Sequence, residues 1–251
     1  GGQFMDFYNR GSKFYRWIVK KNMDMQTQVW FEGMPSLDIV KRISNAHLVY
    51  YPNYVVEENI ANVVSERPKD RINLCYFGRV TPEKNVDVVI KAFDMLCKKY
   101  DDVFLTIIGG SGFSKEYVKD IDAMIDNSPY KSHIVRKGLT PFAEIKEIMQ
   151  SQHFFVFPSK ERCEGHSNSL NEAMAQGLVP IVSDYHFNRA IVGDDRMIVD
   201  GYDPQAYADK IIQIRENYDL KKLSIEMRDR VKTAFSYNVV NKRIYEELKK
   251  I

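Results

Sequence analysis

The chain has 251 residues, of which 44% are hydrophobic and 28% charged, and its formal net charge is +2. This composition is ordinary for a soluble globular protein with one large or two small domains. It gives no reason to expect a nucleic-acid partner, and no apolar run approaches about 18 residues, so no transmembrane helix is expected.

Cysteine usage and the start of the chain bear on its compartment. Cys75, Cys97 and Cys163 are unevenly spaced and form no C-x-x-C or Cys/His cluster. This favours a reducing compartment and argues against structural zinc. We therefore expect a cytoplasmic protein, with the inner face of the membrane as an alternative location. The chain begins Gly1-Gly2 with no methionine and no signal peptide, so we expect a processed or truncated chain.

The first 63 residues read as about half of an α/β domain. Strands are predicted at Gln28–Phe31 and Ala46–Tyr51, with a helix between them at Leu37–Ile43. An earlier helix around Trp17 combines aromatic and basic residues, and such helices bind anionic membranes or pack by their aromatic rings against their own domain. Residues 64–71 are polar and charged and are interpreted as a linker.

From residue 72 onward, short apolar runs alternate with helical patterns. The predicted strands are Ile72–Phe77, Val103–Ile108, His133–Arg136, Phe154–Phe157, Val179–Ser183 and Met197–Val199. The predicted helices are Pro82–Tyr100 with Thr81 as its cap, Lys115–Asp126, Pro141–Ser151, Tyr207–Glu216, Leu220–Phe235 and Val239–Leu248. Strands that are apolar almost throughout are covered on both faces. The pattern therefore predicts an α/β fold with a doubly wound parallel sheet.

The segment from residue 158 to residue 177 carries the most chemistry. Glu164 and Glu172 lie eight positions apart and flank a turn rich in glycine and serine. A helix is predicted over 168–176, with Ser167 as its cap and Gly177 as its stop. Free amides at a helix start form an anion site, and the two carboxylates add acceptors for hydroxyl groups. An anion next to a polyol is the chemical description of a nucleotide sugar.

A second segment, residues 78–85, follows the first predicted strand of the sheet, and open α/β folds bind ligands at this end of their strands. Gly78 lets the backbone approach a ligand, while Arg79 and Lys84 bring the positive charge that a diphosphate leaving group needs. A glycine-rich run at residues 109–112 lacks the spacing of a dinucleotide-binding or P-loop motif, so a plain turn is expected there.

Structural alternatives stay open for these segments. Ser169 and Glu172 have the spacing of a capping box, in which the glutamate satisfies an orphan amide. Glu83 and Lys84 also fit the exposed face of a helix. His166 is of interest through its neighbours alone, since an isolated histidine is often structural.

Together these segments resemble the retaining glycosyltransferases of the GT-B architecture, in which two Rossmann-like domains face each other. Within that group they resemble glycosyltransferase family 4, the glycosyl transferases of group 1. The matching residues run in order over about residues 70–200 and are Phe77-Gly78-Arg79, Glu83-Lys84-Asn85, Gly109-Gly110, Lys137-Gly138, Pro158-Ser159 and Glu164 with Glu172.

The resemblance implies a domain for each part of the chain. Residues 1–68 would be the C-terminal half of the acceptor-side Rossmann-like domain, and residues 69–236 the domain that binds the nucleotide-sugar donor. Residues 237–251 would form a helix that packs back on the first domain. The front half of the acceptor domain would then be absent, which leaves open whether the chain transfers sugar by itself.

The resemblance also implies roles for single residues. Arg79 and Lys84 would hold the donor pyrophosphate and Glu164 would contact the transferred sugar, and these three would be the catalytic residues. Glu172 would bind the ribose hydroxyls. The donor-binding residues would also include Gly78 and Gly110. The amides of the turn formed by Gly165, His166, Ser167, Asn168, Ser169 and Leu170 would hold sugar and phosphate, and Lys137 and Gly138 would lie beside the base. Ser167 stands where many members have proline.

The implied reaction moves a hexose from a nucleoside diphosphate, UDP or GDP, to a polysaccharide or lipid-linked acceptor with retention of configuration. In such enzymes an oxygen of the donor phosphate takes the acceptor proton, so no protein base, metal or cofactor is expected. Two alternatives remain. A nucleotide-sugar epimerase of the same architecture would need acid/base groups, for which His166 is the one candidate. A non-catalytic nucleotide-binding module is the other.

Overall fold

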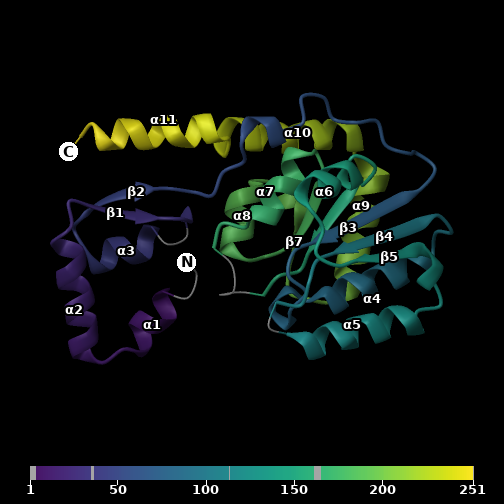
Figure 1. Ribbon diagram of the computed structural model, residues 1–251, viewed down its shortest axis with the longest axis horizontal. Helices are drawn as coiled ribbons and strands as arrows, with labels where there is room; N and C mark the ends of the chain where they lie inside the picture. The colour runs from purple at the N-terminus through teal and green to yellow at the C-terminus, as the bar shows by residue number, and fades with distance from the viewer. Residues whose placement is uncertain (1–3, 35–36, 113, 161–164, 251) are drawn as a thin grey trace.

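Two parallel sheets of unequal size organise the chain (Figure 1). The structure is a computed structural model, which describes residues 4–34, 37–112, 114–160 and 165–250. The strands are β1 (Gln28–Phe31), β2 (His47–Tyr50), β3 (Ile72–Phe77), β4 (Val103–Ile108), β5 (Ile134–Lys137), β6 (Phe154–Phe157), β7 (Val179–Ser183) and β8 (Ile198–Val199). The α-helices are α1 (Phe4–Arg10), α2 (Lys13–Asp24), α3 (Leu37–Ile43), α4 (Val86–Cys97), α5 (Lys115–Asn127), α6 (Phe142–Met149), α7 (Asn168–Ala175), α8 (His186–Val192), α9 (Pro204–Asn217), α10 (Leu220–Ala234) and α11 (Tyr237–Leu248).

The larger sheet has six parallel strands in the order β5-β4-β3-β6-β7-β8. Every residue of β3, β6 and β7 is buried, as strands are when helices cover both faces of their sheet. Helix α4 packs against α9, and α7 packs against α10. Figure 1 shows α4 and α5 below the sheet and α7 and α10 above it. The predicted doubly wound parallel sheet is confirmed.

The predicted helix at Pro82–Tyr100 is wrong at its start. A short 3₁₀ turn occupies Pro82–Lys84, and α4 begins only at Val86. Between them Asn85 adopts a left-handed conformation, with φ 50°, which interrupts any continuous helix. The Thr81 side chain makes no capping hydrogen bond. The other predicted elements agree with the structure to within three residues at each end.

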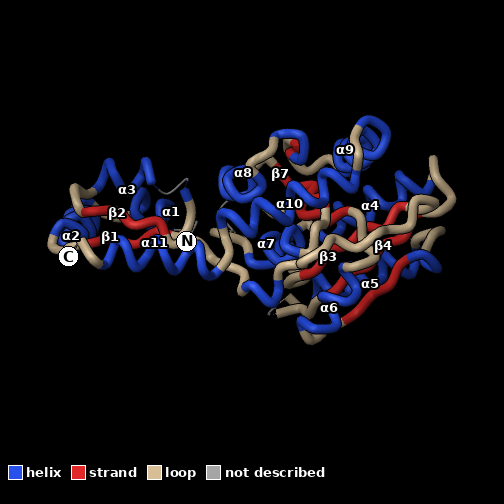
Figure 2. The backbone as a smooth tube through the Cα atoms, turned by 90° about the horizontal axis from the view of Figure 1, so that it is seen from above, coloured by secondary structure: helices blue, strands red, loops and turns tan. Residues whose placement is uncertain are grey.

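The smaller sheet pairs β1 with β2 in parallel, and the last helix lies against it. Val49 of β2 forms a buried cluster with Val240 and Ile244 of α11. Figure 2 shows α11 reaching from the end of α10 across to the small sheet. The chain also crosses between the two parts at residue 55, where the Val55 amide donates to the Phe235 carbonyl at 2.9 Å.

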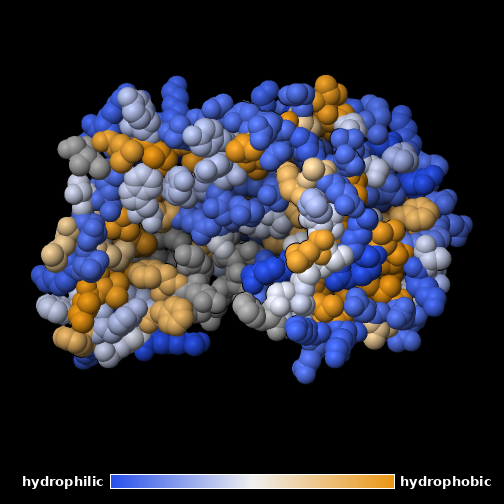
Figure 3. Space-filling view, in the orientation of Figure 1, coloured by the Kyte–Doolittle hydropathy of each residue, from blue (hydrophilic) through white to orange (hydrophobic). Residues whose placement is uncertain are grey.

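Helix α2 does not pack by its aromatic rings against the domain. None of its residues is buried, and Phe14, Trp17 and Ile18 are exposed. Hydrophobic side chains gather over α1 and α2 at the lower left of Figure 3. The interpretation of this segment as an ordinary packed surface helix is therefore wrong for the chain described here. No helix among the described residues has the length and apolar character needed to cross a bilayer.

Candidate active site

The carboxyl ends of β3 and β6 meet where the strand order reverses. Open α/β sheets bind ligands in the crevice outside this point. The chain leaves β3 into Gly78 and Arg79, and it leaves β6 into Pro158 and Ser159. The side-chain amide of Asn85 donates to the Pro158 carbonyl at 2.9 Å. The fold therefore brings two segments that are far apart in the sequence, residues 78–85 and the turn after β6, to one edge of the sheet.

Glycines allow the ends of three strands to approach one another closely. A Cβ on Gly109 would stand 1.8 Å from the Gly78 carbonyl oxygen, so no larger residue fits there. The φ angle of Gly109 is +142°, which side chains other than glycine rarely allow. The Gly109 amide donates to the Gly138 carbonyl of the next loop at 3.1 Å. The run at residues 109–112 is therefore more than a plain turn.

A cavity of about 480 Å³ opens beside these glycines. Its volume lies within the range of small-molecule binding sites. The residues around it come from the carboxyl ends of β3, β4 and β5, the loops that follow them and α6, and are Phe77, Gly78, Arg79, Ile108, Gly109, Gly110, Ser111, Gly112, Leu139, Thr140 and Ile145. It is thus placed next to the predicted phosphate-binding residues.

The two predicted cations differ in their surroundings. The Tyr76 hydroxyl donates to the Arg79 carbonyl at 2.6 Å and fixes the backbone, while the Arg79 side chain is exposed. Lys84 is only 6% exposed, and its Nζ lies 5.1 Å from the centroid of the Phe157 ring. The alternative that Lys84 lies on an exposed helix face is therefore wrong. The 3₁₀ turn places this ammonium beside Phe157, the last residue of β6.

Helix α7 begins and ends where the sequence predicts. The Ser167 hydroxyl accepts a hydrogen bond from the Leu170 amide at 3.4 Å, and Gly177 follows the helix with a φ of +76°. The amides of the first helical residues have no partner inside the helix. A Cβ on Gly78 would stand 3.8 Å from the Ser169 hydroxyl oxygen. The first turn of α7 therefore adjoins the loop that carries Arg79.

Glu172 is not part of a capping box. Because Ser167 is the cap, Glu172 is the fifth residue of the helix, and its carboxylate makes no hydrogen bond to any described residue. Burial raises the pKa of Glu172 to about 7. A buried carboxylate without a partner costs stability, and perturbed groups of this kind gather at functional sites. Glu172 therefore fits a ligand-binding role better than a structural one.

His166 is held as a neutral ring inside the molecule. It is 4% exposed, its Nδ1 accepts from the Asn171 side-chain amide at 3.1 Å, and its ring centroid lies 4.7 Å from that of Phe235. Because the same amide also donates to the Asn53 carbonyl, Nδ1 must be the acceptor and Nε2 carries the proton. Burial lowers the pKa of His166 to about 4. A base with this pKa is weak at neutral pH, so the buried His166 is poorly suited to acid/base chemistry.

The predicted base-binding residues lie at the end of β5. The Lys137 ammonium forms an ion pair with Glu144 at 2.8 Å, and Gly138 has open space around it. Leu139, which is 92% exposed, lies beside Gly110. This edge is adjacent to the glycine cluster, and the role of Lys137 and Gly138 beside the base stays a prediction.

Glu164 falls outside the described residues, so its role also stays a prediction. The turn that follows it is described, and it meets a residue from the small sheet that no local sequence pattern indicates. A Cβ on Gly165 would stand 2.5 Å from Oε2 of Glu32. The side-chain amide of Asn53 donates to Oε1 of Glu32 at 2.9 Å and to the His166 carbonyl at 2.6 Å. The sequence feature that could have indicated Glu32 is its position directly after β1, at the carboxyl end of a parallel strand.

Buried hydroxyl and amide groups form a hydrogen-bond network at this edge of the sheet. The Ser183 hydroxyl donates to the Ser159 carbonyl at 2.6 Å. The side-chain amide of Asn188 donates to the Ser183 hydroxyl at 3.1 Å and reaches the Ser159 hydroxyl at 3.4 Å. All three residues are buried. These hydrogen bonds join the turn after β6 to the end of β7 and to α8.

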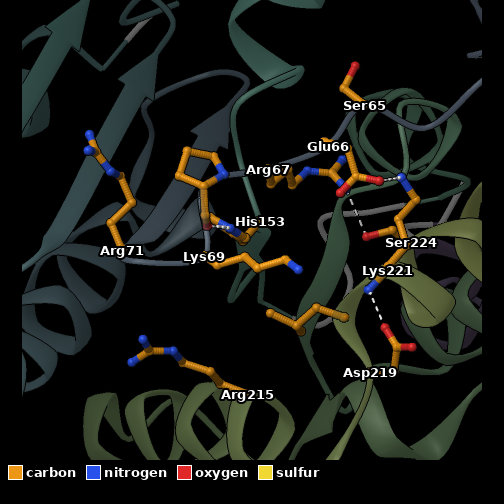
Figure 4. Close-up of a pocket in the computed structure, with 12 residues that line it drawn as sticks. Ser65, Glu66, Arg67, Lys69, Arg71, His153, Arg215, Asp219, Lys221 and Ser224 are labelled. Carbon is orange, nitrogen blue, oxygen red and sulfur yellow. Dashed lines mark hydrogen bonds and ion pairs between the residues drawn. The ribbon is translucent and has the colours of Figure 1, made fainter.

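A second cavity, of about 510 Å³, lies at the opposite edge, where β3 and β6 begin (Figure 4). It is lined by the segment interpreted as a linker, by His153 and by the start of α10. Two of its cations already have protein partners, since Arg67 donates to the Ser224 hydroxyl at 2.9 Å and Lys221 pairs with Glu66. Because it also lies away from the carboxyl ends of the strands, we do not assign it to the nucleotide sugar.

The chain is similar to known glycosyltransferases in sequence and in fold. Residues 56–234 match the model of the family described as glycosyl transferases group 1. The chain belongs to this family. An uncharacterized glycosyltransferase of Methanocaldococcus jannaschii is 27% identical over 198 residues, which cover 75% of this chain and 46% of that protein. The chain spans about half the length of the curated relatives it matches.

Solved structures show the same fold at low identity. HepE of Anabaena, crystallised with UDP, superposes with a TM-score of 0.80 at 15% identity and covers 97% of this chain and 69% of its own. A point variant of TarM of S. aureus, crystallised with Fondaparinux, alpha-GlcNAc-glycerol and UDP, has a TM-score of 0.74 at 18% identity, over 95% of this chain and 47% of its own. The fold is the Rossmann-like α/β fold of GT-B glycosyltransferases.

Proposed function

We propose that the protein containing this chain transfers a hexose from a nucleoside diphosphate sugar, UDP- or GDP-linked, to a polysaccharide or lipid-linked acceptor with retention of configuration, as a member of glycosyltransferase family 4. The observation that carries the proposal is the meeting of two segments. The loop with Gly78 and Arg79 adjoins the first turn of α7 at Ser169, and Glu172 lies one turn further along that helix without a partner among the described residues.

Each half of the donor has a matching group at this edge. Arg79 and Lys84 supply positive charge for the pyrophosphate, and the free amides at the start of α7 add hydrogen-bond donors. Glu172 accepts hydrogen bonds from the ribose hydroxyls, and these bonds offset the free-energy cost of burying its carboxylate. Lys137 and Gly138 lie where the base would extend along the ends of β4 and β5.

The proposed mechanism uses electrostatic stabilisation of the leaving group. As the glycosidic bond breaks, negative charge grows on the diphosphate, and fixed cations beside it stabilise the transition state. Arg79 and Lys84 supply that charge, so we propose no metal and no cofactor. A phosphate oxygen of the donor takes the acceptor proton on the same face of the sugar. This route needs no protein base, and the pKa of about 4 for His166 fits that.

The experiment is an assay with acceptor-dependent readout. The protein is incubated with UDP-glucose, UDP-N-acetylglucosamine or GDP-mannose, with and without neutral p-nitrophenyl glycosides as acceptors. The anomeric configuration of the product is read by NMR from the one-bond coupling constant between C1 and H1. Acceptor-dependent release of nucleoside diphosphate with an α-linked product supports the proposal. Loss of the donor at the same rate without acceptor, by hydrolysis or epimerisation, would overturn it and favour the epimerase alternative.

We also propose that α2 makes peripheral contact with the inner face of an anionic membrane. The helix exposes Phe14, Trp17 and Ile18 and carries the cations Lys13, Arg16, Lys20 and Lys21. Exposed aromatics with basic neighbours favour the interface of anionic lipids. Sedimentation with phosphatidylglycerol vesicles should fall when Trp17 is replaced by Glu. Equal sedimentation of the variant would contradict this.

A further inference from the structure

A carboxylate from the small sheet reaches the turn that precedes α7. Glu32 directly follows β1, and it is half-buried. Its Oε2 lies 2.5 Å from the position that a Cβ on Gly165 would take. A side chain at position 165 would have to displace this carboxylate, so the glycine there allows the approach of Glu32.

The carboxylate is held in place from several sides. Its Oε1 accepts from the side-chain amide of Asn53 at 2.9 Å, and the Asn53 carbonyl accepts from the buried Asn171 of α7 at 3.2 Å. The next residue, Gly33, lies so close to the ring of Phe187 that a Cβ on it would stand 2.0 Å away. The end of β1 is therefore seated on the larger part of the molecule, and Glu32 does not lie on a free surface loop.

One oxygen of Glu32 has no hydrogen-bond partner among the residues that the structure describes. Oε1 is engaged by Asn53, whereas Oε2 makes no hydrogen bond to any residue that the structure describes. A carboxylate accepts hydrogen bonds and donates none when ionised. On the turn at residues 165–167, such a group binds a hydroxyl and repels a second anion at short range.

We propose that Glu32 is a specificity residue that accepts a hydrogen bond from a hydroxyl of the transferred sugar and rejects sugars with an acidic substituent at that position. The site therefore selects neutral hexoses over uronic acids. This inference rests on the proposed function, in which the turn at residues 165–170 holds the sugar and phosphate. Attraction to the hydroxyl and repulsion of a carboxylate both contribute to such selection.

The structure also permits a simpler role, in which Glu32 only joins the two parts of the molecule through Asn53. The two roles differ in what they affect. A residue that only joins the small sheet to the larger part affects the whole site, so its loss changes the affinity for the nucleoside diphosphate and for the nucleotide sugar by the same factor. Loss of a contact to the sugar changes only the difference in affinity between the nucleotide sugar and the free diphosphate.

The test is calorimetric titration of UDP, UDP-glucose and UDP-glucuronic acid, or of the matching GDP, GDP-mannose and GDP-mannuronic acid if GDP is the nucleotide bound. The variants are Glu32→Ala and the nearly isosteric Glu32→Gln, with the exposed Glu58→Gln as control. In Glu32→Ala we expect unchanged affinity for the diphosphate and a loss of roughly tenfold or more in affinity for the neutral nucleotide sugar, as for a hydrogen bond to a charged group. In Glu32→Gln, which keeps the Asn53 bond, we expect the preference for the neutral sugar over the uronic acid to narrow by about tenfold.

Three results would overturn the inference. Parallel losses for the diphosphate and both sugars would make Glu32 a structural tie. Unchanged preference in Glu32→Gln would exclude a role in sugar choice. Failure of every nucleotide to bind would refute the proposed function together with this inference.

Discussion

Replacement of Glu172 by glutamine should stabilise the free protein at alkaline pH. Burial raises the pKa of this carboxyl from 4.5 to about 7. Below pH 4.5 the group is protonated in both the folded and the unfolded chain, so its full stabilising contribution is present there. As the pH rises toward 7, Glu172 ionises in the unfolded chain before it ionises in the folded one. The free energy of unfolding therefore falls over this range.

The size of this effect follows from the pKa difference. A shift from 4.5 to about 7 corresponds to about 3 kcal/mol, and partial exposure to solvent reduces it to on the order of 2 kcal/mol. Glutamine keeps the shape and removes the charge. At about pH 8 the Glu172→Gln variant should therefore be more stable than the wild type by on the order of 2 kcal/mol, while near pH 4.5 the two should be similar.

Urea unfolding followed by far-UV circular dichroism at both pH values measures this difference. The same variant should bind nucleoside diphosphate more weakly, because a neutral amide loses the charged hydrogen bonds to the ribose. A gain in stability with a loss of binding is the expected combination for a functional group in a costly position. The reasoning would be refuted by a variant that is less stable at pH 8, or by equal pH dependence of unfolding in both proteins.

Three further changes test other parts of the site. Gly109→Ala should lower the melting temperature, since its Cβ would stand 1.8 Å from a carbonyl oxygen and strain of this kind costs more than about 1 kcal/mol. The control is Gly138→Ala, whose Cβ would have no atom within 4 Å, and this variant should melt like the wild type. His166→Phe should lose less stability than the wild type when the pH falls from 7 to 4.5. Burial lowers the pKa of His166 from 6.5 to about 4, so the wild-type fold loses stability as the pH falls through that window. An equal fall in melting temperature for the two proteins between pH 7 and pH 4.5 would contradict this prediction. Arg79→Ala should weaken UDP far more than UMP in calorimetric titrations, and equal losses would argue against a pyrophosphate role.

Local patterns predicted the elements of the larger sheet well. The strands at Ile72–Phe77 and Phe154–Phe157 are continuous apolar runs, and a run of this kind shows its structure within a few residues. The start of α7 was equally clear, since serine and glycine mark its ends by their own conformational preferences.

Features that depend on distant contacts were not predictable. Lys84 is buried next to Asn85, which takes a left-handed conformation and donates to the Pro158 carbonyl in the turn after β6. Nothing near Lys84 in the sequence indicates that contact. Glu32 reaches Gly165 only because the crossing at Val55 seats the small sheet against the larger part. Packing between elements that are far apart in the sequence decides such placements.

The most direct measurement is calorimetric titration of the chain with UDP, GDP, ADP and CMP, repeated with Glu172→Ala. The account predicts saturable binding of a nucleoside diphosphate by the wild type, weakened by roughly tenfold to a hundredfold in the variant, as for the loss of a charged hydrogen bond. Circular dichroism should show that the variant keeps its fold. Equal affinity of the two proteins, or no binding of any nucleotide, would contradict the claim that this edge of the sheet binds a nucleotide sugar.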